Sequence, residues 1–430
     1  MLTAVALLFF VFLFVSVPVA FALALATIPV FMLGDYMPMT VALQRMYGAT
    51  QSYPLLAVPF FILAGNLMNS TGITERLLHF ARLLTGWMTG GLAQVSIALS
   101  ALMGGISGSA VADAAMEARL LGDAMAQRGY PRGFSASVIA FSSIITATIP
   151  PSIGLILFGF VAEVSIGRLL LGGVVPGLLM TLTLLFTTAV IARRNGYAPE
   201  LAERPRAGEV GRAFLSCFWA LAFPVFLLVG FRYGFFTATE AGAIVVVYAL
   251  IVGVFMHREL TFARFLKAME DSVCDIGMVM LIVAMGAVLG HALTIEQAPH
   301  AIAVFLTDFA GERYLTLFVV LIIVFLAGTI MEATVNVLLI TPLVLPSLVL
   351  AGFDPVHVGV LMIILVTMGG NTPPVGVIMY TVCGILKCSF TEFIRWSWPF
   401  LAAMLALVAV MALFPQVVLF LPDAVMGPAR

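Results

Sequence analysis

The chain has 430 residues, of which 62% are hydrophobic and only 10% are charged. Soluble domains usually carry about 25% charged residues, so this composition excludes an ordinary soluble fold. The net charge of −1 provides no general attraction for nucleic acid, and no nucleic-acid partner is expected. Because the composition is so hydrophobic, the chain must lie largely in the lipid bilayer. Only helices and closed barrels satisfy the hydrogen bonds of the backbone there.

Long continuous apolar runs favour helices, because barrel strands would show short alternating segments. Each crossing needs about 20 residues. We predict membrane-spanning segments at 3–33, 54–70, 133–160, 168–192, 213–232, 237–256, 272–293, 356–386 and 397–421. Two further apolar regions, at about 90–120 and 314–350, are interrupted by small and polar residues. We expect each to be a re-entrant hairpin that enters and leaves on one side.

The distribution of basic residues tests this count of crossings, because cytoplasmic loops carry an excess of Lys and Arg. The connection at 193–212 is the most arginine-rich and is placed in the cytoplasm. Of the 20 Lys and Arg residues, 15 then lie inside, and the outer ones are Arg45, Arg168, Arg232, Arg313 and Arg430. This bias predicts a cytoplasmic N-terminus and a periplasmic C-terminus.

The chain contains an internal repeat. The segment IPPSIGLI at 149–156 resembles TPPVGVIM at 372–379, and an offset of 223 aligns their proline pairs. The same offset maps Gly105 onto Gly328 and Asp113 onto Asn336. By the charge count the first copy begins outside and the second begins inside, so the copies are inverted. Inverted repeats with discontinuous helices are a recurring plan of secondary transporters, which bind their substrate at the repeat interface.

We therefore predict an all-α membrane protein with two inverted repeats, re-entrant hairpins and broken transmembrane helices. Two short amphipathic segments, Ile73–Leu84 and Ala298–Phe309, precede the hairpins. The expected regions are an N-terminal span with an outer loop (1–53), the first repeat (54–192), a cytoplasmic loop with two scaffold spans and an amphipathic arm (193–271), and the second repeat with the C-terminus (272–430).

Four segments interrupt the helices, at 104–113, 146–152, 328–336 and 368–375. Proline removes a backbone donor, and glycine permits unwound backbone. The freed carbonyl groups must be buried in protein or line a polar cavity. Carbonyl and hydroxyl oxygens suit a small cation such as Na⁺, and helix N-termini at the hairpin tips suit a substrate carboxylate. The alternative is that Gly and Ser only permit close packing and Pro only kinks the helices.

The symmetry of the breaks predicts two Na⁺ sites. The first joins the hairpin residues Ser107, Gly108 and Ser109 to Thr148, Ile149 and Ser152; the second joins Glu332, Ala333 and Thr334 to Gly370, Asn371 and Thr372. The expected substrate contacts are Ser107, Ser109, Asp113, Thr334 and Asn336. Acids at membrane depth are costly, which singles out Asp113 and Glu332. No Walker A motif is present, so ATP is not an expected cofactor.

Four motifs together resemble the large membrane subunit of tripartite ATP-independent periplasmic (TRAP) transporters over nearly the whole chain. They are VPFFILAGNLM at 58–68, GGISGSAVAD at 104–113, ATIPPS at 147–152 and GNTPPVG at 370–376. The resemblance implies a bacterial inner-membrane location, a small four-helix membrane subunit and a periplasmic binding protein that delivers an organic acid. It also implies import driven by a Na⁺ gradient, with an elevator motion of the hairpins and broken helices against a scaffold.

Three other functions are considered beside this one. A stand-alone Na⁺/carboxylate carrier would share the architecture and need no partners. An intramembrane enzyme would need a nucleophile, but the serines of the segment GISGS at 105–109 have no histidine nearby in sequence, and no enzyme is expected. A channel would conduct without saturation.

Overall fold

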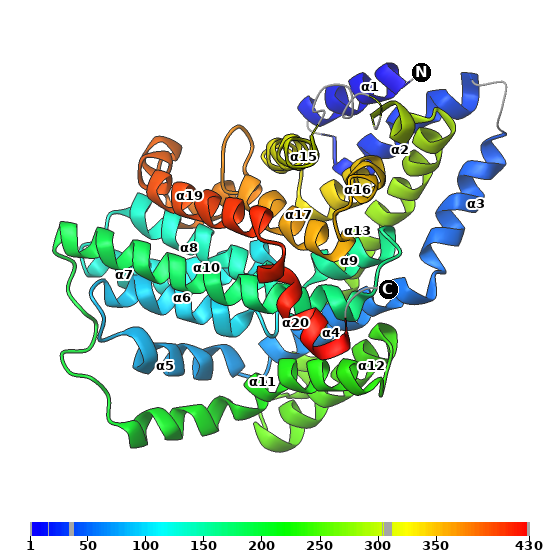
Figure 1. Ribbon diagram of the computed structural model, residues 1–430. Helices are drawn as coiled ribbons and strands as arrows, with labels where there is room; N and C mark the ends of the chain where they lie inside the picture. The colour runs from blue at the N-terminus through cyan, green and yellow to red at the C-terminus, as the bar shows by residue number, and fades with distance from the viewer. Residues whose placement is uncertain (1, 16, 34–37, 303, 305–311, 428–430) are drawn as a thin grey trace.

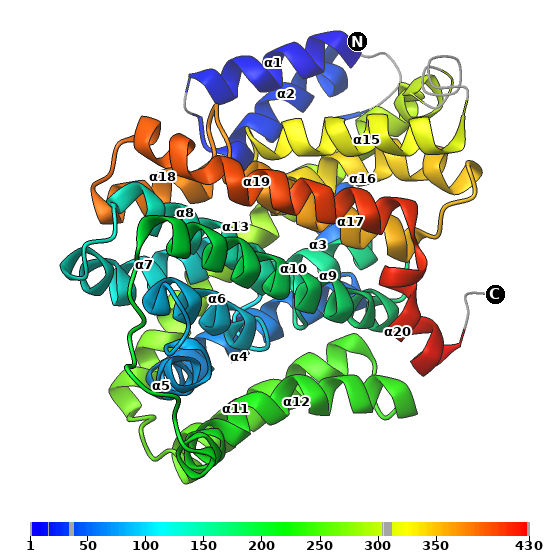
Figure 2. The ribbon, with the colours of Figure 1, turned by 60° about the vertical axis from the view of Figure 1, so that its left-hand side comes forward.

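The computed structural model describes residues 2–15, 17–33, 38–302, 304 and 312–427. The elements found there are helices (Figures 1 and 2). Six of the described helices are long and apolar enough to cross a membrane, and two bent pairs raise this number to eight. The predicted class, an all-α membrane protein, is confirmed.

The N-terminal region differs from its prediction in two ways. The single span expected at 3–33 is wrong, because α1 (Leu2–Phe14) and α2 (Val19–Leu33) are separate helices that pack against each other. Pro18 has no N–H with which to continue the first helix. The outer loop expected before residue 54 contains α3 (Met39–Thr50), which packs Ala42 against α13. That helix is too short to be recognised as a span.

The first half continues with η1 (Tyr53–Leu56), α4 (Ala57–Asn69), α5 (Ile73–Thr85), α6 (Gly91–Met103), α7 (Ala110–Gln127), α8 (Arg132–Thr148), α9 (Ile153–Val161) and α10 (Ile166–Asn195). The amphipathic helix α5 and the α6–α7 hairpin lie where they were predicted. α8 and α9 form one broken helix with a bend of 48°. Figure 1 shows α6, α8 and α10 side by side.

The middle of the chain consists of α11 (Ala207–Tyr233), α12 (Ala238–Ile251), the π-helical turn η2 (Val252–Met256) and α13 (Phe262–Ile295). α11 packs on α5, and α12 packs on α4. The boundary expected at 271/272 lies inside α13, which is one continuous helix. In both ribbon views α11 and α12 lie at the edge opposite α1 and α2 (Figures 1 and 2).

The second half contains α15 (Arg313–Gly328), α16 (Ala333–Leu350), α17 (Pro355–Gly369), α18 (Val377–Leu386), α19 (Phe390–Leu413) and α20 (Gln416–Met426). The span expected at 397–421 is divided before Gln416, because Pro415 interrupts the helix. Half of the amphipathic segment expected at 298–309 lies outside the described residues.

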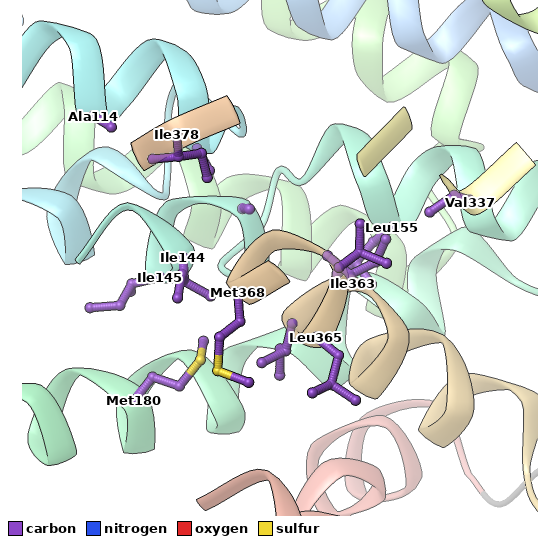
Figure 3. Packing of buried hydrophobic residues seen from close by; sticks show 14 of the residues in the cluster. Ala114, Ile144, Ile145, Leu155, Met180, Val337, Ile363, Leu365, Met368 and Ile378 are labelled. Carbon is purple, nitrogen blue, oxygen red and sulfur yellow. The ribbon is translucent and has the colours of Figure 1, made fainter. Parts of the chain in front are cut away.

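The two halves present the same order of elements: a hairpin, a broken helix and a long helix. These are α6–α7, α8–α9 and α10 in the first half, and α15–α16, α17–α18 and α19 in the second. The broken helices meet in the core, where α8 and α9 contact α17. Figure 3 shows Leu155 beside Ile363, and Met180 close to Met368. This packing buries the first break and one side of the second in the protein interior.

Candidate functional site

The tip of the first hairpin lies directly against the first broken helix. Gly108 has φ +64°, and a Cβ on it would lie 2.3 Å from the carbonyl oxygen of Pro151. A Cβ on Gly104 would meet the side chain of Ile149 at 2.8 Å. The structure therefore brings the predicted group Ser107–Ser109 to the break at 149–152, at a distance that only glycine at position 108 permits.

Hydroxyl groups define the helix ends around this contact. Ser109 caps α7 by accepting from the backbone N–H of Ala112 at 3.4 Å, and Ser152 caps α9 by accepting from Leu155 at 3.2 Å. Thr148 donates its hydroxyl hydrogen to the carbonyl oxygen of Ile144. A hydroxyl oxygen has two lone pairs, so these groups keep acceptor capacity for a cation.

The second hairpin and the second break are joined by backbone hydrogen bonds. The carbonyl oxygen of Thr329 accepts from the N–H groups of Val375 at 3.1 Å and Gly376 at 2.9 Å. Glu332 caps α16, because its carboxylate accepts from both the N–H and the hydroxyl of Thr334, at 2.9 and 3.2 Å. A negative charge is favoured at this end of a helix. Ala333 follows as the first residue of α16.

Two buried asparagines lie in the second half. Asn371 donates from Nδ2 to the carbonyl oxygen of Ala140 on α8 at 2.8 Å, which links the second break to the first half. Its Oδ1 has no hydrogen-bond partner among the described residues. Asn336 is fully buried, and neither of its side-chain polar atoms has a partner in that part of the chain. Buried polar groups are usually paired, so these atoms are candidates for a contact with water, an ion or a solute.

The remaining residues of the second group have partners of their own. Thr372 donates to the carbonyl oxygen of Gly369 at 2.9 Å. The carbonyl oxygen of Gly370 accepts from the N–H groups of Ile378 and Met379, at 3.0 and 3.2 Å. The carbonyl oxygen of Gly370 therefore accepts two hydrogen bonds in this structure and would give one up on binding a cation, whereas Oδ1 of Asn371 is free to accept.

Asp113 lies behind the first tip rather than on it. Its side chain is 1% exposed, and its Oδ2 accepts from Ser100 at 2.9 Å and from Thr146 at 2.7 Å. Its backbone N–H donates to the carbonyl oxygen of Ser109. Asp113 therefore connects the hairpin tip to α6 and to the end of α8.

Glu117 is a buried carboxyl that the sequence analysis missed. It lies one turn after Asp113 and is fully buried. It accepts from Ser96, from Ser100 at 2.8 Å and from Ser142 at 3.4 Å. The segment MEARLLGD around it reads as a solvated helix face. The usable signal is that α6, α7 and α8 each carry a polar pair four residues apart, a spacing that puts both members on one face: Ser96 and Ser100, Asp113 and Glu117, and Ser142 and Thr146.

A cavity of about 820 Å³ lies between α3, α9 and α13. Its lining includes Arg45, His291, Gln44, Ser52 and Thr294. Arg45 forms no ion pair with any residue that the structure describes. Sequence reasoning overlooked this basic cavity because α3 was not predicted.

Outside the spans, an ion pair fixes the amphipathic helix α5 to the linker before α13. Arg76 lies 2.6 Å from Glu259, and Arg264 lies 3.6 Å from the same carboxylate. The hydrogen bond from Arg76 lowers the pKa of Glu259 below its ordinary value.

The fold matches those of two solved membrane transport proteins. The crystal structure of the YdaH transporter of Alcanivorax borkumensis matches with a TM-score of 0.60, covering 96% of this chain and 99% of that one. MtrF of Neisseria gonorrhoeae matches with a TM-score of 0.55, over 87% of this chain and 84% of its own. Both are 14% identical to this chain, so they show the fold alone.

Residues 6–417 match the family described as tripartite ATP-independent periplasmic transporter, DctM component. The chain is 38% identical over 389 residues to the sialic acid TRAP transporter large permease protein of Vibrio cholerae, and 34% identical over 385 residues to the 2,3-diketo-L-gulonate large permease protein of Escherichia coli. Each match covers 90% of both proteins. The chain belongs to the DctM family of TRAP transporter large permeases, and it is a transporter subunit rather than an enzyme.

Proposed function

We propose that this chain imports a carboxylate-bearing solute as the large permease of a tripartite transporter in the bacterial inner membrane. A periplasmic binding protein delivers the solute, and a small four-helix membrane subunit braces the permease. The relatives named above are permeases for sialic acid and 2,3-diketo-L-gulonate, and a Pseudomonas aeruginosa relative that is 32% identical is one for C4-dicarboxylates. These solutes share a carboxylate. A further relative is an isethionate permease, so a sulfonate belongs in any substrate panel.

The import is coupled to Na⁺ at two sites. The first uses Ser107, Gly108 and Ser109 with Thr148, Ile149 and Ser152; the second uses Glu332, Ala333 and Thr334 with Gly370, Asn371 and Thr372. The single observation that carries this proposal is that each hairpin tip lies against its broken helix, through Gly108 and Pro151 in one half and through Thr329 and Gly376 in the other. Such contacts concentrate carbonyl and hydroxyl oxygens where Na⁺ can replace its water ligands.

The solute is held between the two tips. Its carboxylate faces the N-termini of α7 and α16, where the helix dipole is positive, and Ser107, Ser109 and Asn336 donate hydrogen bonds. Thr334 joins them when its hydroxyl hydrogen turns from Glu332 to the solute. Asp113, which is buried and already bonded to two hydroxyls, supports the tip from behind. The basic cavity with Arg45 and His291 is the entry for the anion, since Arg45 is one of the basic residues assigned to the outer side.

Transport proceeds by an elevator motion. The two halves are inverted repeats whose hairpins and broken helices move together. α11, α12 and α13 form part of the scaffold, and α5 joins the moving part to it. The N-terminus lies in the cytoplasm and the C-terminus in the periplasm. The packing of α8 against both α17 and α18 supports this division, because it makes the broken helices one packed unit.

Reconstitution tests the proposal. The chain is placed in liposomes with its candidate small subunit, and uptake of a panel of carboxylates and isethionate is measured with and without a binding protein and a Na⁺ gradient. The expected result is saturable uptake that requires all of these components. Uptake by this chain alone would instead favour a stand-alone Na⁺/carboxylate carrier, and current without saturation would favour a channel.

A further inference from the structure

The carboxyl of Glu117 occupies a buried cage of hydroxyl groups with no positive charge beside it among the described residues. Ser96 and Ser100 of α6 and Ser142 of α8 surround it, and all three are fully buried. Ser100 lies 2.8 Å from Oε1 of Glu117 and 2.9 Å from Oδ2 of Asp113, so one hydroxyl bridges two acids.

The surrounding helices provide no compensating base. α6 has no ionisable side chain, α8 has only Arg132, and α18, which also packs on α7, has Tyr380 and Cys383. Arg132 begins α8, at the end opposite Thr146, and donates to backbone carbonyls of residues 386 and 387. On α7 itself Arg119 and Asp123 are exposed. Across the described ranges neither Asp113 nor Glu117 forms an ion pair.

The hydrogens available do not satisfy two ionised acids. Ser100 carries one hydroxyl hydrogen, so it cannot donate to Asp113 and Glu117 at the same time. Oδ1 of Asp113 is buried and has no partner among the described residues. Two neighbouring carboxylates in a buried site disfavour each other's charge, and a charge at membrane depth is costly in itself. The two ionised acids therefore lack a compensating positive charge, and the two contacts of Ser100 lack a second hydrogen.

We propose that Glu117 is a proton-binding site behind the first hairpin tip. With a proton on Oε1, Glu117 donates to Ser100, Ser100 donates to Asp113, and Ser96 donates to Oε2 of Glu117. Each short contact then has its own hydrogen, and the charge of the two acids falls from −2 to −1. The proton belongs on Glu117 because Asp113 lies in the first turn of α7, where the helix dipole stabilises a carboxylate.

This site is separate from the proposed Na⁺ sites. Its ligand is a proton, and the hydrogen-bond partners of Glu117 are serines that are not assigned to Na⁺. Asp113 nevertheless links it to the tip through the backbone of Ser109. The protonation state of Glu117 therefore sets the net charge of the two acids behind the first hairpin tip, whether or not the coupling ion is Na⁺.

Infrared spectroscopy of the purified full chain in lipid nanodiscs tests the proposal. A protonated carboxyl has a C=O stretching band that shifts in D₂O, and the wild-type spectrum at neutral pH should contain one such band that Glu117→Gln removes. Asp123→Asn, an exposed acid on the same helix, is the matched control and should leave it unchanged. Asp113→Asn is the second variant: removing the neighbouring charge weakens proton binding, so the band should disappear at lower pH than in the wild type.

Three results would overturn the proposal. An unchanged band in folded Glu117→Gln would show that Glu117 is ionised. An unchanged titration in Asp113→Asn would show that the two acids do not interact. Loss of the band on adding Na⁺ at constant pH would make the cage a metal-ion site. None of these results depends on transport, so they are distinguishable from failure of the proposed Na⁺-coupled import.

Discussion

The two halves share their backbone plan but not the residues behind it. In the first half a polar network of α6, α7 and α8 supports the hairpin tip. At the offset of 223, Asp113 corresponds to Asn336 and Glu117 to Ile340, while Ser142 and Thr146 correspond to Leu365 and Gly369. The second half therefore forms the same hairpin and break with a mostly apolar support. The broken-helix geometry does not require the acids, which points to a role for them beyond folding.

The breaks also differ in their surroundings. Pro150 and Pro151 are buried, whereas Pro373, Pro374 and Val375 are exposed. The first break is enclosed by the hairpin tip and α10, because a Cβ on Gly173 would meet the carbonyl oxygen of Thr148 at 2.1 Å. The second break is open on one side. The two halves therefore have the same order of elements but differ in how far their breaks are exposed.

The largest expected loss of stability comes from a substitution that makes the second half resemble the first. Asn336→Asp places a carboxylate where Ile323 and Gly369 stand in place of Ser100 and Thr146, the two hydroxyl donors to Asp113 in the first half. An unpaired buried charge costs about 3–5 kcal/mol. Thermal unfolding of the purified chain in Na⁺-free buffer should show this loss, and Na⁺ should reduce it if the position faces an ion site. Asp113→Asn should lower the free energy of unfolding by less. If Asn336→Asp and the wild type were equally stable without Na⁺, the comparison between the halves would be contradicted.

Gly108→Ala should separate the tip of the first hairpin from the break in the first broken helix. A left-handed conformation costs an alanine about 1–2 kcal/mol, and crowding against Pro151 should add about 1–3 kcal/mol. Gly129→Ala is the matched control, since Gly129 has φ +78° and a Cβ there would meet no described atom within 4 Å. Unfolding and uptake should both be impaired much more in Gly108→Ala. Similar behaviour of the two variants would mean that the close approach has no consequence.

Ser100→Ala removes the bridge between the two acids. Loss of a buried hydrogen-bonding group that leaves its partners unsatisfied costs about 1–3 kcal/mol. Ser143→Ala is the control, because Ser143 is equally buried and donates only to the carbonyl oxygen of Ala140. Chemical denaturation should show the larger loss for Ser100→Ala. If the control were the more destabilised variant, the acid network would not support the first tip.

The smallest expected effect concerns Arg76 and Glu259, whose side chains are 33% and 35% exposed. Arg76→Gln should cost about 0.2–1 kcal/mol, and Arg264→Gln should cost less because its contact is longer. The lowered pKa of Glu259 means that the pair stabilises the fold at neutral pH and that this contribution is lost as the pH falls through the folded-state pKa. Stability measured from neutral to acidic pH should show the difference between Arg76→Gln and wild type shrinking. A difference that persists in acid would exclude the ion pair as its cause.

The sequence predicted the features that rest on hydrophobic length and on proline and glycine. The hairpins at 90–120 and 314–350, both broken helices and the amphipathic helix α5 follow from these signals. The division at Pro18 was missed because the apolar run continues through it. α3 was missed because a short helix with one buried side lacks the length of a span.

Glu117 shows a different limit of sequence reasoning. Charged residues on a helix face usually indicate solvent, and the burial of Glu117 depends on how α6 and α8 pack around α7. The unpaired atoms of Asn336 and Asn371 likewise emerge only from tertiary contacts. The spacing of polar residues in the sequence can suggest such candidates, but the packing of the helices determines which of them are in contact.

The central claim is that both tip–break contacts hold Na⁺. The most direct test is Na⁺-dependent uptake by the reconstituted transporter carrying Ser107→Ala or Asn371→Ala, with Thr367→Ala as a buried control whose hydroxyl donates only to its own helix. Each site variant should need about tenfold more Na⁺ for half-maximal uptake, equivalent to about 1.4 kcal/mol, while expression and the control stay at wild-type values. Unchanged Na⁺ dependence in both site variants would contradict the account.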